Sequence, residues 1–69
     1  MHETLDELLH RQPFKAFEIH LSNGNSYVVK HPEFARLLKA KIVIGLPDTE
    51  QVVICFLLHV AEVKFFDRG

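Results

Sequence analysis

The sequence predicts a small α+β domain, in which one helix precedes a strongly bent antiparallel sheet of five strands. Three observations predict this fold class. Leucines recur at helical spacing near the start, alternating or continuous apolar runs of strand length follow, and an Asn-Gly pair joins the first two runs. The chain has 69 residues, which is the size of one small domain. We therefore expect residues 1–69 to form a single domain.

A helix is predicted over about residues 4–11. One apolar stripe at helical spacing is formed by Leu5, Leu8 and Leu9. The segment Thr4-Leu5-Asp6-Glu7 matches a capping box, in which the threonine hydroxyl and the glutamate carboxylate accept from free amides at the helix start. Pro13 disfavours helical conformation at the preceding residue and ends the element.

A hairpin is predicted next. Residues 17–22 alternate strictly between apolar and polar, as a half-buried strand does, and Asn23-Gly24 favours a tight turn. A two-residue turn would place Val28 on the core face, whereas a three-residue loop with a glycine bulge would place Tyr27 and Val29 there. We favour the three-residue loop, because it buries the larger pair of side chains.

The remaining elements are a helical insert and three strands. Pro32 stands at a first helical position, so residues 32–38 are predicted to begin with a helical turn. A turn is expected at Pro47-Asp48, a bend near His59, and strands over 42–46, about 51–57 and 61–65. The third and fourth strands are apolar on both faces, which is typical of strands covered on both faces. Either the sheet curls into a barrel whose outside is covered, or a second subunit covers it.

Composition favours self-association. Hydrophobic residues make up 48% of the chain and the mean hydropathy is +0.08, although a domain of this size buries only about 60% of its unfolded surface. Apolar surface is therefore left for a partner, and we expect a homo-oligomer at micromolar concentration. The residues expected at its interface are Val53, Cys55, Leu57 and Phe66.

The cysteine count and the first residues of the chain indicate the cellular compartment of the protein. Cys55 is the single cysteine, so a disulfide scaffold is excluded and a reducing, cytoplasmic location is favoured. The chain opens with acidic residues, unlike a signal peptide. Its longest apolar run has seven residues, far fewer than the roughly 20 that span a bilayer.

No pattern for catalysis or cofactor binding is found. His20, His31 and His59 are isolated, and the paired spacings typical of zinc ligands do not occur. Cys55 lies within an apolar run, where burial raises the thiol pKa and lowers reactivity. Three glycines do not supply a phosphate-binding loop. We expect a protein that is not an enzyme and has no metal, cofactor or small-molecule substrate.

Basic residues gather between positions 30 and 41. These candidates for phosphate contact are Lys30, His31, Arg36, Lys39 and Lys41. Aromatic side chains between them could stack on bases, as in single-strand binding proteins. The alternative is that these are solvated loop charges, which the net charge of −1 favours.

Two resemblances follow from these residues. The chain resembles a group of short, uncharacterised bacterial proteins that share a sequence pattern. In this chain the pattern consists of Gln12-Pro13-Phe14, residues 17–21, Gly24, residues 27–29 and residues 31–34. The order of elements resembles the Sm-like small barrel, whose family includes the RNA chaperone Hfq, and also SH3-like barrels. The Sm-like resemblance implies a ring-forming barrel that binds RNA. The family's uridine site uses a Lys-His pair before the last strand, where this chain has Leu58-His59.

Overall fold

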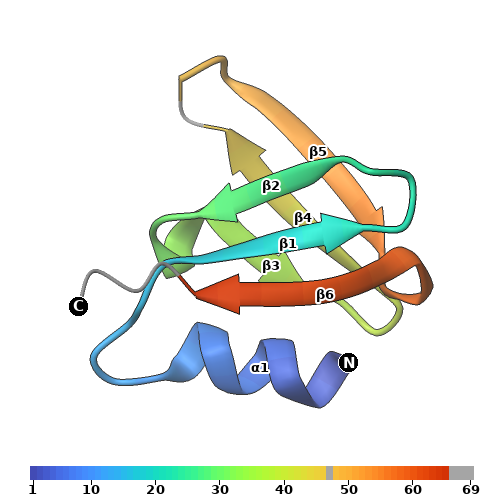
Figure 1. The fold of residues 1–69 in the computed structure, drawn as a ribbon. Coiled ribbons are helices and arrows are strands. Elements are labelled where there is room, and N and C mark those ends of the chain that lie inside the picture. The colour runs from blue at the N-terminus through green and yellow to red at the C-terminus, as the bar shows by residue number, and fades with distance from the viewer. Residues whose placement is uncertain (47, 66–69) are drawn as a thin grey trace.

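The computed structural model describes residues 1–46 and 48–65, in which one α-helix is followed by six β-strands (Figure 1). The elements are α1 (His2–His10), β1 (Phe17–Leu21), β2 (Ser26–Val29), β3 (Ala35–Leu37), β4 (Lys41–Leu46), β5 (Gln51–Phe56) and β6 (Val60–Phe65). Two 3₁₀ helices, η1 (Pro32–Phe34) and η2 (Leu57–His59), lead directly into β3 and β6. The predicted α+β class is therefore confirmed.

The strands form two antiparallel sheets of three, which we call sheet A (β2-β1-β6) and sheet B (β3-β4-β5). The prediction of one bent five-stranded sheet is therefore wrong. The additional strand is β3, which pairs with residues 42–44 of β4. The helical insert predicted over 32–38 is helical only at η1. Its later residues have high intrinsic helix propensity, but pairing with β4 satisfies their backbone groups and turns Leu37 toward the core.

Helix α1 begins earlier than predicted. The amide of Leu5 donates to the carbonyl of Met1 at 3.1 Å, and Met1 is the N-cap without a side-chain cap hydrogen bond. Thr4 therefore lies inside the helix, and the predicted capping box is wrong. The first turn closes through backbone groups ahead of Thr4, so the threonine hydroxyl is not at the position where a cap acts. The helix ends at His10, one residue before the predicted end.

The β1–β2 hairpin has the favoured three-residue loop. Ile19 pairs with Tyr27, and the amide of Leu21 donates to the carbonyl of Asn25 at 2.8 Å. Gly24 has φ +94°, the left-handed conformation that a glycine bulge requires. The side-chain oxygen of Asn23 accepts from the amide of Asn25 at 2.9 Å, which fixes the loop further.

The core lies between the two sheets and α1. Its buried side chains are Leu5, Phe17, Ile19, Val29, Ile42, Ile44 and Cys55. Helix α1 packs against β3, and in Figure 1 it runs along the side of the molecule on which β6 and β3 lie. Leu8 and Leu9 pack against the core beside Leu5, as the predicted leucine stripe requires.

The later strands lie close to their predicted positions. β4 and β5 match the predicted third and fourth strands, except that Leu57 belongs to η2. The bend expected near His59 is η2 itself. The carbonyl of His59 accepts from the amide of Ser22 at 2.8 Å. The turn residue Pro47 lies outside the described residues.

Candidate interaction surface

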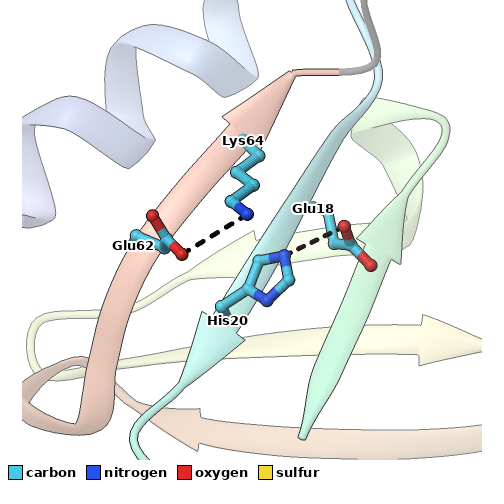
Figure 2. A network of polar contacts seen from close by, with 4 residues as sticks. All are labelled: Glu18, His20, Glu62 and Lys64. Carbon is cyan, nitrogen blue, oxygen red and sulfur yellow. Dashed lines mark hydrogen bonds and ion pairs between the residues drawn. The ribbon is translucent and has the colours of Figure 1, made fainter. Parts of the chain in front are cut away.

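The outer face of sheet A is polar. Glu18 and His20 alternate with buried residues of β1, and Glu62 and Lys64 lie beside them on β6 (Figure 2). Nε2 of His20 lies 2.9 Å from Oε1 of Glu18, and Nζ of Lys64 lies 3.6 Å from Oε1 of Glu62. The register also places Glu18 opposite Lys64. This face carries the paired charges of an ordinary solvated surface.

The outer face of sheet B is apolar by contrast. We call Val52, Ile54 and Phe56 the β5 stripe; their exposed fractions are 64%, 56% and 51%. The three side chains lie on one face because alternate residues of a strand point the same way. Val43, which is half-buried, extends the stripe onto β4 as the pairing partner of Ile54.

The β5 stripe lies on an edge strand. Strand β5 pairs with β4 on one side, and the sheet ends on its other side. Its sequence, Gln51–Phe56, contains neither proline nor a charged residue, and its register with β4 is uninterrupted. Proline, charge and bulges are the usual means by which proteins protect a sheet edge against further pairing. This edge has none of them.

Opposite charges flank the two ends of the stripe. Nζ of Lys41 lies 5.6 Å from the ring centroid of Phe56, and Lys41 is the pairing partner of Phe56. At the other end, Asp48 and Glu50 are exposed in the β4–β5 turn. The stripe therefore runs from a basic end to an acidic end.

Of the residues predicted for an interface, Val53 and Cys55 lie on the other face of this strand. Val53 and Leu57 are partly buried against the core, Cys55 is only 2% exposed, and Phe66 lies outside the described residues. Burial raises the pKa of the Cys55 thiol above its ordinary value. Alternation could not choose the face, because both sets of side chains are apolar. The choice follows from the register, which places Cys55 opposite the buried Ile42.

The five basic candidates lie in two segments of the chain. Arg36, Lys39 and Lys41 belong to the β3–β4 hairpin, on sheet B, whereas Lys30 and His31 lie between β2 and η1. The ring of His31 packs edge-on against Phe34, with centroids 5.6 Å apart. Arg36 lines a cleft between α1 and η1, and the acidic residues that also line it are Asp6 and Glu33.

Within residues 1–46 and 48–65, no three histidine, cysteine or acidic side chains come together as metal ligands would. The same part of the chain contains no helix with the length and apolar character needed to cross a membrane.

Comparisons of this chain with protein-family models, with curated proteins and with solved structures found no match.

Proposed function

We propose that this protein is a non-enzymatic binding or scaffolding module that self-associates through sheet B, at the β5 stripe. The observation that carries the proposal is the contrast between the two sheets. Sheet A presents paired charges to solvent, whereas the β5 stripe presents three large apolar side chains next to one another. Contiguous apolar surface of this kind is typical of protein–protein contacts.

Burial of the β5 stripe against a partner would be favourable in free energy. Fully burying a valine, isoleucine or phenylalanine side chain contributes about 1.5–3 kcal/mol relative to full exposure. Each side chain of the stripe is about half to two-thirds exposed, so covering it would gain roughly 1 kcal/mol or more per residue. A domain of 69 residues has a small core, and such domains commonly obtain part of their stability from association.

Size exclusion with light scattering tests this proposal. The wild-type chain should have a mass that is a multiple of 8.0 kDa at micromolar concentration. Ile54→Lys places a charge in the middle of the stripe and should shift the mass toward one chain. Gln12→Lys adds the same charge at an exposed position away from sheet B, and should leave the mass unchanged. A wild-type mass of 8.0 kDa throughout would contradict the proposal.

The second candidate is an Sm-like RNA-binding protein. If β2 and β3 are counted as one strand interrupted by η1, the order of elements is that of the small barrels. Arg36 and Lys41 flank Val43 on sheet B, and Lys41 lies over an exposed aromatic ring at Phe56. Cations next to an aromatic ring support binding of single-stranded RNA.

Salt distinguishes the two candidates. Contacts with phosphate weaken steeply as salt concentration rises, whereas an apolar contact does not. Fluorescence anisotropy of a labelled single-stranded RNA at 50 and 200 mM salt would support this second function if binding is seen and falls steeply. The acidic residues Asp6 and Glu33 beside Arg36 favour self-association over this alternative.

A further inference from the structure

We infer that the partner on sheet B is a second copy of this chain, joined by antiparallel pairing of β5 with β5. The inference rests on the proposed self-association and assigns its geometry. Pairing would join two copies of sheet B into one six-stranded sheet, in which the two β5 stripes lie side by side on the same face and contact each other across the new strand pair. Two observations support this geometry: β5 differs from the other three sheet edges, and opposite charges flank the two ends of the stripe.

The other three sheet edges are shorter, covered or charged. Strand β3 has three residues and packs against α1. Strand β6 carries Glu62 and Lys64, and α1 runs beside it in Figure 1. Strand β2 has four residues, fewer than the six of β5. Only β5, among the described strands, is a six-residue edge without charge or proline.

Charge selects the antiparallel direction. A parallel neighbour in register would place the two Lys41–Phe56 ends side by side and Glu50 beside Glu50. An antiparallel neighbour places the acidic turn of each copy, with Asp48 and Glu50, beside the Lys41–Phe56 end of the other. Like charges directly opposite each other destabilise a strand pair, and opposite charges stabilise it. The stripe is therefore complementary to its own copy turned end to end.

Symmetry limits the assembly. Antiparallel pairing of two identical strands has a two-fold axis, here near Val53 and Ile54 at the middle of β5. Each copy uses its β5 edge once, so this contact closes as a dimer and does not propagate into a fibre. Residues that face each other across the axis must belong to the same face, so the stripe of one copy continues into the stripe of the other.

Cross-linking with a short bismaleimide tests the geometry, with variants that each carry one cysteine in addition to Cys55. Ile54→Cys places a thiol near the axis and should give a cross-linked dimer. Thr49→Cys is the matched control at the acidic turn; its two copies would lie about 30 Å apart, at about 3.3 Å per residue. Thr49→Cys alone should give no dimer, but its mixture with Leu58→Cys should. The wild type sets the background, since Cys55 is buried.

The possible outcomes separate this geometry from self-association itself. Light scattering is recorded on the same samples before the reagent is added. A dimeric mass with cross-linking at position 54 and in the mixed sample supports the antiparallel pair. An oligomeric mass without cross-linking at 54, or with self-cross-linking at 49, overturns the geometry while self-association stands. A mass of one chain overturns both.

Discussion

Ile54 and Cys55 are neighbours on β5, yet Ile54 is 56% exposed whereas Cys55 is 2% exposed. Cys55 faces the core opposite Ile42, and Ile54 faces outward opposite Val43. The strand thus presents apolar side chains on both faces, and the single chain covers one of them. This difference between adjacent residues is the basis of the proposed self-association, and it makes both residues useful for testing the fold.

Cys55 should be protected from modification in the folded chain. Its burial and raised pKa keep the thiol protonated and inaccessible. Alkylation by iodoacetamide at pH 8 should be slow in buffer and fast in denaturant, as followed by mass spectrometry. Equal rates in the two conditions would contradict the inward orientation of Cys55.

Alkaline pH should lower the stability of the domain. The folded state binds the Cys55 proton more tightly than the unfolded state, because its pKa is raised from 9.0. The stabilisation is fully present below the pKa of the unfolded chain and is lost as pH rises through the folded pKa. Urea unfolding at pH 8 and 10 should therefore show a larger decrease for wild type than for Cys55→Ala. Equal decreases would contradict this assignment.

Thr4→Ala should be neutral or slightly stabilising. Thr4 lies inside α1, where alanine is favoured over threonine by up to about 0.7 kcal/mol. A thermal melt of the two proteins measures the difference. A loss of about 1 kcal/mol, the usual cost of removing a cap, would instead indicate that Thr4 caps the helix.

Gly24→Val should destabilise the domain by more than about 1 kcal/mol, because a β-branched residue is strained at positive φ. A Cβ atom at Gly24 meets nothing within 4 Å, so the cost is conformational rather than steric crowding. Gly24→Asn is the matched control and should cost less, because asparagine tolerates this conformation. Urea unfolding of both variants checks the prediction, which equal losses would contradict.

Leu5→Ala should be the most damaging of these changes. Leu5 is the fully buried residue of α1, and truncation of a buried leucine costs about 2–5 kcal/mol. Leu58→Ala removes the same atoms from a side chain that is 83% exposed and should change stability by less than about 0.5 kcal/mol. Similar losses in urea unfolding would contradict the docking of α1.

Local sequence signals predicted most of the fold. The leucine stripe, the Asn-Gly loop and the alternation in β1 depend on neighbouring residues, and the structure has all three. Strand β3 was missed because its helix-forming residues become a strand only through pairing with β4. The exposed face of β5 was missed for a related reason. Its two faces are equally apolar, so the choice between them depends on long-range register.

Sedimentation velocity of the wild-type chain over a dilution series, at low and high salt, tests the central claim most directly. Self-association through an apolar stripe predicts a mass above 8.0 kDa at micromolar concentration, which falls toward one chain on dilution and persists at high salt. A single species of 8.0 kDa at every concentration and salt would contradict the account.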